Sequence, residues 1–477
     1  MPVDHAIVFG DSLSDIGRKW KTKLGGFAAW KSDGELRLLN TSATGRFSDS
    51  KNWTDYMFEA TSGKSLVSES LEGTISASGE HHRLSSRWIH PPGAPPFRFA
   101  NYAVGGAVGW KAAQLKNKIG LTTFSDQVDE FEADFAAVSQ VDGIRKREFL
   151  FIVMFGSNDI YTDEKDSNVS AEIGAGIIEQ CDRLTRLIAN NNALDQAHFV
   201  IAGAAYPNQS IYYTSQLESL KVQESRELGF LRRAIAANPG FREIMPSEDD
   251  LRAPRRDYER KVAGLHGQVA TLNRCVKSHC AKTPQFHYFS MRIALLALRS
   301  KAADLGINPD KAQTIAQYNK ISPGMNWVTE KKDYIHFHNE NNDALKVDGL
   351  FPLFTADQKH PTSRGYKALW GDMESLLKTK KLGFGNIVPD ADRVPSPVIK
   401  KAYWQNDAEV HTCQKCQVKF STFTRRHHCR KCGGIFCDKC SKRKATLDYP
   451  LTDGGQSARR GVKDCRVCET CYAALGG

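Results

Sequence analysis

The sequence predicts an α/β fold in which helices pack against a parallel sheet. Four short apolar runs have the length and composition of buried strands: residues 6–10, 149–155, 198–204 and 287–291. Three stretches between them carry apolar residues at spacings of three and four, as amphipathic helices do: residues 127–138, 171–191 and 262–279. Strands that alternate with helices of this length favour a layered α/β sandwich around a parallel sheet.

Interruptions of this alternation suggest how the chain is divided. Polar stretches near 208–258 and 300–350 are predicted to be insertions that cover or line a substrate site. Prolines and glycines punctuate residues 384–400, which we interpret as a linker. The predicted units are therefore a large domain at 1–383 and a small cysteine-rich module at 401–477.

Composition indicates a globular protein. The chain has 477 residues, of which 41% are hydrophobic, so a sizeable buried core is expected. No apolar run approaches the roughly 18 residues that a membrane-spanning helix requires. The first residues lack the basic-then-apolar pattern of a secretory signal. We therefore expect a soluble protein with no signal peptide or transmembrane segment.

Positive charge is concentrated near the C-terminus. The chain carries a formal net charge of +11, and residues 401–477 hold 15 Lys and Arg against 7 Asp and Glu. Such a surface favours an anionic partner, either lipid or nucleic acid, and charge alone does not choose between them.

Eight of the twelve cysteines form four C-x-x-C pairs within the last 65 residues: Cys413, Cys416, Cys429, Cys432, Cys437, Cys440, Cys468 and Cys471. Clustered pairs of this kind predict zinc ligands, whereas the alternative, a disulfide framework, suits short secreted scaffolds. Cys181, Cys275 and Cys280 lie on helix-like stretches and are interpreted as buried apolar residues. Cys465 breaks the spacing of the last pair and is assigned to neither zinc site.

The first predicted strand runs directly into a Gly-Asp-Ser-Leu segment at residues 10–13. Ser12 is thereby placed at the carboxyl end of a strand, where open α/β sheets locate their chemistry. Backbone N–H groups of the following turn can stabilise an oxyanion there. Taken alone, the segment is also compatible with a simple helix N-cap.

Four sequence blocks, in order, resemble the GDSL, or SGNH, hydrolase family. They are the block at Ser12, the glycine block at 101–107, the Gly-Ser-Asn-Asp block at 156–159 and the acid–histidine block at 357–362. The resemblance covers about residues 5–380. It is strongest to the lipid-acting branch, which contains phospholipases A, lysophospholipases and glycerophospholipid–cholesterol acyltransferases. It implies a three-layer α/β/α sandwich with a parallel sheet.

The four blocks supply a complete set of roles for ester hydrolysis. Ser12 is the predicted nucleophile, His360 the general base, and Asp357 the carboxylate that orients the imidazole. The oxyanion hole is predicted from the N–H groups of Ser12 and Gly106 and the side-chain amide of Asn158. The alternative is that Gly106 and Asn158 only turn the chain or permit tight packing.

Three neighbours of Ser12 receive other interpretations. Asp11 and Asp15 are conceivable acids, but neither stands three residues before the histidine, and we interpret them as helix-start and structural residues. Arg18 stands where many lipolytic members of the family have Asn. This departure changes the first loop and none of the proposed catalytic atoms.

The C-terminal module resembles a FYVE domain. The resemblance is carried by Trp404-x-x-Asp407, by the Arg-Arg-His-His-Cys-Arg-x-Cys-Gly run at 425–433, and by Arg466-Val467-Cys468. It implies two structural zinc ions with closed four-thiolate sites. It also implies interleaved pairs, with one ion bound by Cys413, Cys416, Cys437 and Cys440 and the other by Cys429, Cys432, Cys468 and Cys471.

The same resemblance implies recognition of phosphatidylinositol 3-phosphate. Five basic residues are expected to bind its phosphates: Arg425, Arg426, His428, Arg430 and Arg466. Asp407 is expected to accept hydrogen bonds from inositol hydroxyls, and Phe423 to insert into the bilayer. Nucleic acid is disfavoured as the partner because the cysteine spacing lacks the C2H2 pattern.

Together these observations predict a phospholipase A or lysophospholipase that acts through an acyl-enzyme on membranes containing phosphatidylinositol 3-phosphate. The hydrolase needs no cofactor. The alternatives are a glycerophospholipid–sterol acyltransferase and a phosphoinositide-binding tether whose hydrolase half is inert or cleaves non-lipid esters. We expect a peripheral protein of endosomal or phagosomal membranes, and we hypothesise a bacterial effector that is translocated into a host cell.

Overall fold

A computed structural model of the chain describes residues 3–19, 46–48, 51–62, 66, 98–110, 122–139, 146–162, 169–313, 346–355, 357–384, 410–421, 424–429, 432, 434–450 and 458–475. The predicted linker lies almost entirely outside the described residues, as does most of the predicted insertion at 300–350.

A five-stranded parallel sheet forms the centre of the large domain, in the order β2-β1-β3-β4-β5. Its strands are β1 (His5–Gly10), β2 (Arg98–Asn101), β3 (Glu148–Met154), β4 (Gln196–Ala202) and β5 (Phe286–Phe289). Every residue of β1 and β3 is buried, which explains why both strands are apolar after their first residues, His5 and Glu148. The predicted parallel sheet is confirmed, and the short edge strand β2 is an addition that the sequence did not predict.

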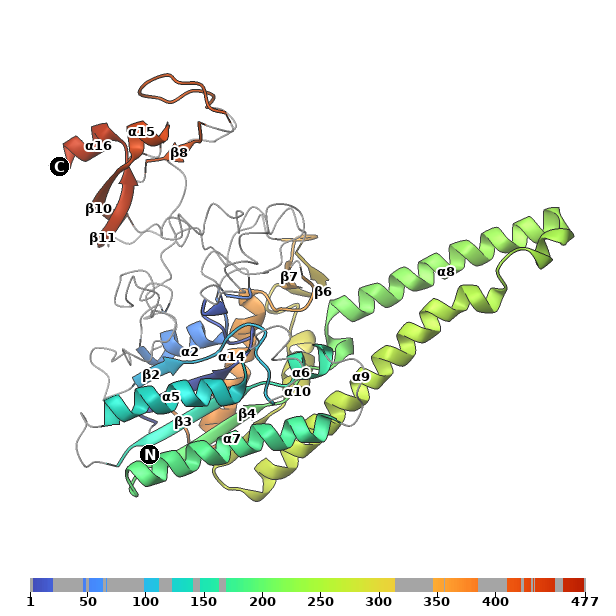
Figure 1. Ribbon diagram of the computed structural model, residues 1–477, viewed down its shortest axis with the longest axis horizontal. Helices are drawn as coiled ribbons and strands as arrows, with labels where there is room; N and C mark the ends of the chain where they lie inside the picture. The colour runs from blue at the N-terminus through green and yellow to red at the C-terminus, as the bar shows by residue number, and fades with distance from the viewer. Residues whose placement is uncertain are drawn as a thin grey trace.

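Helices cover both faces of this sheet. Because side chains alternate across a strand, Val8 and Ile152 join one hydrophobic cluster, whereas Phe9 and Phe151 join another. Three helices complete the first cluster: α2 (Trp53–Ser62), α10 (Met291–Ser300) and α14 (Ser363–Thr379). Three others complete the second: α5 (Phe124–Ser139), α7 (Val169–Asn191) and α9 (Glu248–Lys282). The sheet therefore lies between two layers of helices (Figure 1).

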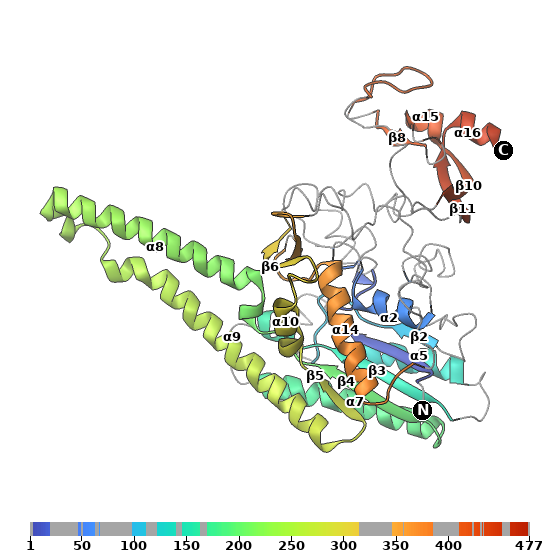
Figure 2. The ribbon, with the colours of Figure 1, turned by 180° about the vertical axis from the view of Figure 1, so that it is seen from behind.

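A long helical hairpin projects from this body (Figures 1 and 2). We call it the arm: α8 (Ile211–Ala237), the 3-10 turn η4 (Pro239–Glu243) and the first half of α9. Within α8 only Leu231 is buried, and ion pairs between the helices supplement the packing: Arg255 to Glu224 at 2.6 Å and Arg232 to Glu248 at 2.9 Å. From the sequence we predicted an insertion at 208–258 and a separate helix at 262–279. This division is wrong, because α9 runs without a break from the end of the first segment through the second.

The base of the arm is fixed to the body by a buried polar side chain. The amide of Asn273 on α9 accepts a hydrogen bond from the N–H of Ala204 at 2.8 Å and donates to its carbonyl oxygen at 2.9 Å. Both backbone groups directly follow β4 and would otherwise be unsatisfied. The Asn273 side chain therefore extends the sheet's hydrogen bonding to α9.

The ends of the second predicted insertion form a small parallel pair, β6 (Ile307–Ala312) with β7 (Phe351–Phe354). Strand β7 is fully buried and leads through a short loop into α14. The acid–histidine block lies in this loop, so the packing of β7 and α14 determines where the block is presented.

The C-terminal elements form a separate small unit. They are β8 (His427–His428), β9 (Ile435–Phe436), α15 (Asp438–Ser441), β10 (Arg443–Pro450), β11 (Ala458–Val467) and α16 (Glu469–Ala474). Strands β8 and β9 form one antiparallel pair and β10 and β11 another. Its hydrophobic cluster consists largely of cysteines. Among the described residues, no helix has both the length and the apolar character needed to cross a bilayer.

Candidate active site and zinc sites

The turn that carries Ser12 is held by the carboxylate of Asp15. This carboxylate accepts hydrogen bonds from the N–H groups of Gly17, Arg18 and Gly105 at 2.8, 2.6 and 2.6 Å. Asp15 is thus a structural residue that joins the nucleophile turn to the glycine block. The interpretation made from the sequence agrees with this geometry.

The acid–histidine loop is organised around the carboxylate of Asp357. One of its oxygens accepts hydrogen bonds from the hydroxyl of Thr355 at 2.8 Å and from the N–H groups of Lys359 and His360 at 2.9 and 3.0 Å. Burial acts to raise the pKa of Asp357, but its attraction to His360 and these hydrogen bonds outweigh burial and hold the pKa well below its usual range. The carboxylate is therefore ionised at neutral pH.

The structure brings Ser12, His360 and Asp357 together. The second carboxylate oxygen of Asp357 is hydrogen-bonded to Nδ1 of His360, and Nε2 of His360 lies 2.7 Å from Oγ of Ser12. Ser12 is only 9% exposed, and the ring of Phe47 packs 5.1 Å from the imidazole. This arrangement allows an imidazole to take a proton from a hydroxyl while a carboxylate stabilises the resulting charge.

Two backbone N–H groups beside the hydroxyl are free to donate. Gly105 gives its N–H to Asp15, whereas no described acceptor receives the N–H of Gly106 or of Ser12. Gly106 has φ of 79°, in the left-handed region that favours glycine. Among the described residues, Gly106 thus keeps its backbone N–H available to a ligand, whereas Gly105 does not.

Asn158 lies in α6 (Ser157–Thr162), directly after β3, with its side-chain amide turned toward protein acceptors. Its Nδ2 group donates to the carbonyl oxygen of Ala107 at 3.0 Å and approaches Oδ2 of Asp11 at 3.4 Å. The contact with Asp11 is the longer and weaker of the two. One amide hydrogen is therefore available for an oxyanion once that contact is released.

Asp11 is more than a residue at a helix start. One of its oxygens accepts the N–H of Leu13 at 3.0 Å, which is the predicted turn role, but the other approaches Asn158. Burial raises the pKa of Asp11 to about 7, although the hydrogen bond from Leu13 and attraction to His360 oppose the change. Burial likewise raises the pKa of nearby Asp159 to about 6. The sequence contained no signal for these changes, because they depend on tertiary burial.

An apolar pocket is lined by the sequence neighbours of Ser12 and His360. It has an empty volume of about 540 Å³, part of which is open to solvent. Leu13, which follows Ser12, and Lys359 and Pro361, which flank His360, contribute to its wall. Most of the remaining wall is apolar and includes Trp53, Met154, Phe289, Leu295, Leu369 and Met373. The predicted insertion at 208–258 lines the pocket through its first residues, Gln209 and Ser210.

The first turns of α8 also hold the acid–histidine loop, a contact that the sequence did not reveal. Gln358 has φ of 62°, and its carbonyl oxygen accepts hydrogen bonds from the hydroxyl of Ser210 at 2.8 Å and the N–H of Tyr212 at 3.2 Å. Its side-chain oxygen accepts a third from the hydroxyl of Ser215 at 2.8 Å. The arm thus contacts the residue between Asp357 and Lys359.

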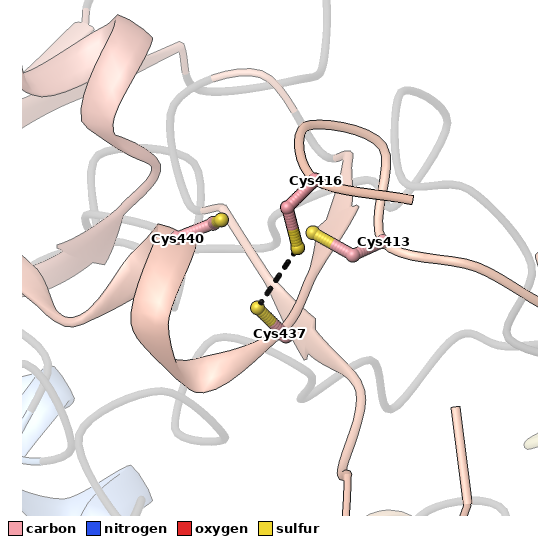
Figure 3. A group of neighbouring side chains, drawn as sticks. All are labelled: Cys413, Cys416, Cys437 and Cys440. Atoms are coloured by element: carbon pink, nitrogen blue, oxygen red, sulfur yellow. Dashed lines mark hydrogen bonds between the residues drawn. The ribbon is translucent and has the colours of Figure 1, made fainter. Parts of the chain in front are cut away.

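The eight paired cysteines form two groups, with the interleaved membership that the resemblance implied: Cys413, Cys416, Cys437 and Cys440, and Cys429, Cys432, Cys468 and Cys471. Within each group all sulfur atoms lie within 4.8 Å of one another. In the first group, Sγ of Cys416 and of Cys437 are 3.6 Å apart (Figure 3). Tetrahedral zinc with Zn–S bonds of about 2.3 Å requires sulfurs roughly 3.8 Å apart, so the residues fit two structural zinc ions.

The basic residues predicted to bind phosphate are only partly described. Nε of Arg426 donates to the carbonyl oxygen of Val410 at 2.9 Å, and its guanidinium lies 5.1 Å from the centre of the Phe420 ring. No described residue accepts a hydrogen bond from its terminal nitrogens. Arg466 instead donates to Asp438 at 2.9 Å. Arg425 and His428 lie just before and within β8. Asp407, Phe423 and Arg430 lie outside the described residues.

Comparison with known proteins concerns the C-terminal part. Residues 403–477 match the model of the FYVE zinc finger family. The chain is 37% identical over 121 residues to the human FYVE, RhoGEF and PH domain-containing protein 4, which covers 25% of this chain and 12% of that protein. It is 40% identical over 94 residues to arrestin domain-containing protein A of Dictyostelium discoideum, covering 19% and 14%. The chain thus spans less than a sixth of the length of these relatives.

Among solved structures, the LM5-1 FYVE domain from Leishmania major is 37% identical, covering 16% of this chain and 82% of that one, with a TM-score of 0.12. The VHS and FYVE tandem domains of Hrs are 28% identical, covering 24% and 44%, with a TM-score of 0.12. With the family match and the two four-cysteine groups, the chain carries a C-terminal FYVE zinc finger that binds two zinc ions.

Stability should fall with rising pH because of Asp11. An acid whose pKa is higher in the folded than in the unfolded state contributes its stability below the unfolded value of about 4 and loses it as pH rises toward the folded value of about 7. Between those limits the contribution declines by up to about 1.4 kcal/mol per pH unit. Urea unfolding of wild type and Asp11→Asn at several pH values from 4.5 to 6.5 measures this slope. Exposed Asp304→Asn is the control, and equal slopes for wild type and Asp11→Asn would contradict the assignment.

Zinc removal should unfold the C-terminal unit. The purified chain should contain two zinc ions, and Cys437→Ser should retain only one, because it breaks one four-thiolate site. Elemental analysis measures the content, and hydrogen exchange in β8–β11 reports local unfolding. Cys465→Ser is the matched control, since Cys465 is equally buried but lies outside both groups. Two ions per chain in Cys437→Ser would refute the ligand set.

Proposed function

We propose that the chain is a serine ester hydrolase of the GDSL type that cleaves acyl esters of lipids, as a phospholipase A or lysophospholipase does. The observation that carries the proposal is the hydrogen-bonded series of Ser12, His360 and Asp357, whose sequence neighbours line an apolar pocket. The four sequence blocks shared with that family support it independently.

In the proposed reaction, Oγ of Ser12 attacks the ester carbonyl while Nε2 of His360 takes the hydroxyl proton. The ionised carboxylate of Asp357 accepts the Nδ1–H and stabilises the imidazolium. When the tetrahedral intermediate collapses, His360 returns the proton to the departing alcohol and the acyl group stays on Ser12. A water molecule, deprotonated by the same imidazole, then releases the fatty acid.

The negative charge of each tetrahedral intermediate must be stabilised by hydrogen-bond donors. These donors should bind the oxyanion more strongly than they bind the carbonyl oxygen of the ester. The N–H groups of Ser12 and Gly106 are free of protein acceptors among the described residues and are suited to this role. Asn158 would join them by exchanging its 3.4 Å contact with Asp11 for the oxyanion. In the resting state this contact keeps the amide beside the site.

The apolar pocket supports a fatty acyl chain as the acyl group. Each methylene group of a ligand that is buried in an apolar pocket contributes about 0.8 kcal/mol of favourable transfer free energy. A pocket walled by residues such as Trp53, Phe289 and Met373 therefore favours long acyl chains over acetyl esters. Sugar acetates and other small esters would gain little from it.

The FYVE finger suggests recruitment to membranes that contain phosphatidylinositol 3-phosphate, and hence association with endosomes. For this chain we propose that Arg425, Arg426, His428, Arg430 and Arg466 contact the phosphates, with Asp407 on the inositol hydroxyls. Phe423 would insert into the bilayer. The relatives named above come from eukaryotes and give no support to a bacterial effector, so the proposal is confined to recruitment.

Replacing Ser12 by Ala should reduce hydrolysis of a soluble fatty-acyl ester by at least about 10³-fold, and His360→Ala should do nearly the same, because the two side chains act as a unit. A fluorophosphonate probe should label wild type and the exposed-serine control Ser219→Ala, but not Ser12→Ala. Product analysis with and without cholesterol separates hydrolysis from acyl transfer to a sterol. Wild-type turnover in Ser12→Ala would reject the triad.

Replacing Arg426 by Ala should weaken binding to vesicles that carry phosphatidylinositol 3-phosphate by about tenfold or more, because it removes a charged hydrogen-bond donor to phosphate. Turnover on a soluble ester should not change, since Arg426 lies in the zinc unit. Co-sedimentation compares vesicles with phosphatidylinositol or its 3-phosphate, and Lys439→Ala is the exposed-cation control. Zinc content confirms that each variant is folded. Equal wild-type binding to both vesicles would leave only nonspecific charge attraction.

A further inference from the structure

The segment that connects β4 to α8 forms part of the pocket wall, and we call this side of the pocket its mouth. We call residues 205–212 the rim segment. Ala205, Gln209 and Ser210 of this segment line the pocket, and Ser210 and Tyr212 donate hydrogen bonds to the acid–histidine loop. Two cations lie against the rim segment, and the proposed reaction uses neither.

The first cation is Lys359, the residue before His360. It is exposed, contributes to the pocket wall, and places Nζ 4.1 Å from the centre of the Tyr212 ring. The N–H of Tyr212 is itself bonded to Gln358, so the ring and the lysine backbone are fixed to each other. Lys359 forms no ion pair in the described part of the chain, and its charge is available to a ligand.

The second cation is Arg292, the residue after pocket-lining Met291. Its guanidinium lies 5.4 Å from the centre of the Tyr206 ring, and its carbonyl oxygen accepts a hydrogen bond from the side chain of Gln209 at 3.0 Å. It is exposed and, like Lys359, forms no ion pair with any described residue. Both cations therefore lie on tyrosine faces of the rim segment, which hold them near the mouth without neutralising them.

Two helix N-termini add positive potential at the same place. Helix α8 begins after Ser210, its N-cap, and α10 begins after Ser290, which caps it. The N-terminal end of a helix carries a partial positive charge. None of the described residues that line the pocket is acidic, while Asp357 is bound to His360 and Asp11 is buried. An apolar interior thus meets a positively charged mouth beside Ser12.

We propose that Lys359 and Arg292 bind the phosphate of a glycerophospholipid while its acyl chain occupies the apolar pocket. The preferred substrate is then a phosphate-bearing lipid ester, and neutral acylglycerols are poor substrates. The inference rests on the proposed esterase activity and specifies its substrate class. Lys359 supplies a mobile point charge and Arg292 a planar donor pair suited to phosphate oxygens.

The chemistry of such a lipid matches the layout of the site. A short glycerol unit joins the phosphate to the acyl ester, so a molecule whose ester carbonyl lies at Ser12 brings its phosphate near the residue adjoining His360. Its hydrocarbon chain then extends past Leu13 into the pocket. A lipid without phosphate satisfies the apolar wall but leaves both cations unpaired.

Two substrates that differ only at the phosphate test this directly. The full-length chain is assayed on 1-oleoyl-lysophosphatidylcholine and on 1-oleoylglycerol, each in neutral detergent micelles, and the ratio of the two kcat/KM values is the readout. Lysophosphatidylcholine has no net charge, so general attraction to an anionic surface cannot produce the preference. Wild type should favour the phospholipid at least tenfold.

Lys359→Gln and Arg292→Gln should each reduce this ratio by about tenfold, the loss expected for one charged hydrogen bond to phosphate. Lys277→Gln, an exposed lysine on α9, is the matched control and should leave the ratio at the wild-type value. Tyr212→Phe keeps the aromatic face under Lys359 and should keep the ratio as well.

The outcomes distinguish this inference from the proposed function. If wild type hydrolyses neither lipid, the esterase proposal itself fails. If wild type hydrolyses both equally, or if the two variants lower both kcat/KM values by the same factor, phosphate recognition by Lys359 and Arg292 is rejected while the esterase proposal stands. A selective loss on the phospholipid supports it.

Discussion

The geometry of the candidate site depends on the hydrogen bonds of the partly buried carboxylate of Asp357. The carboxylate holds its own loop through three hydrogen bonds and the imidazole of His360 through a fourth, so one charge fixes both backbone and side chain. The packing of β7 and α14 then places this loop next to the end of β1, which Ser12 follows. Without an ionised Asp357 the loop would lose its internal scaffold and the imidazole its direction.

The parts of the site that could be predicted from the sequence are those that follow strands and those whose residues recur at a fixed spacing. Parallel strands end at one edge, so Ser12 after β1 and Asn158 after β3 were expected to be near each other. The cysteine pairs were equally readable, since C-x-x-C spacing is set by zinc geometry. Contacts such as Gln358 with Ser210 join residues 148 positions apart and leave no local pattern. Helix α8 escaped prediction for a different reason: with one buried residue it has almost no apolar stripe.

The two parts of the chain obtain their stability differently. The large domain has two extensive hydrophobic clusters, one on each face of its sheet. The C-terminal unit has a small cluster in which cysteines are the main members, so metal binding supplies free energy that a larger core would otherwise provide. Conditions that remove zinc should therefore unfold the C-terminal unit while the sheet and its candidate site stay folded.

The attachment of the arm to the acid–histidine loop has a thermodynamic consequence. The hydroxyls of Ser210 and Ser215 and the N–H of Tyr212 all bind Gln358, so the orientation of α8 and the conformation of the loop are not independent variables. If a ligand in the site altered the conformation of the loop and thereby the orientation of the arm, linkage would require a partner that favours that orientation to strengthen ligand binding by the same free energy. The base of the hairpin and the residue next to Asp357 therefore form one hydrogen-bonded unit, in which a shift of either partner strains the other.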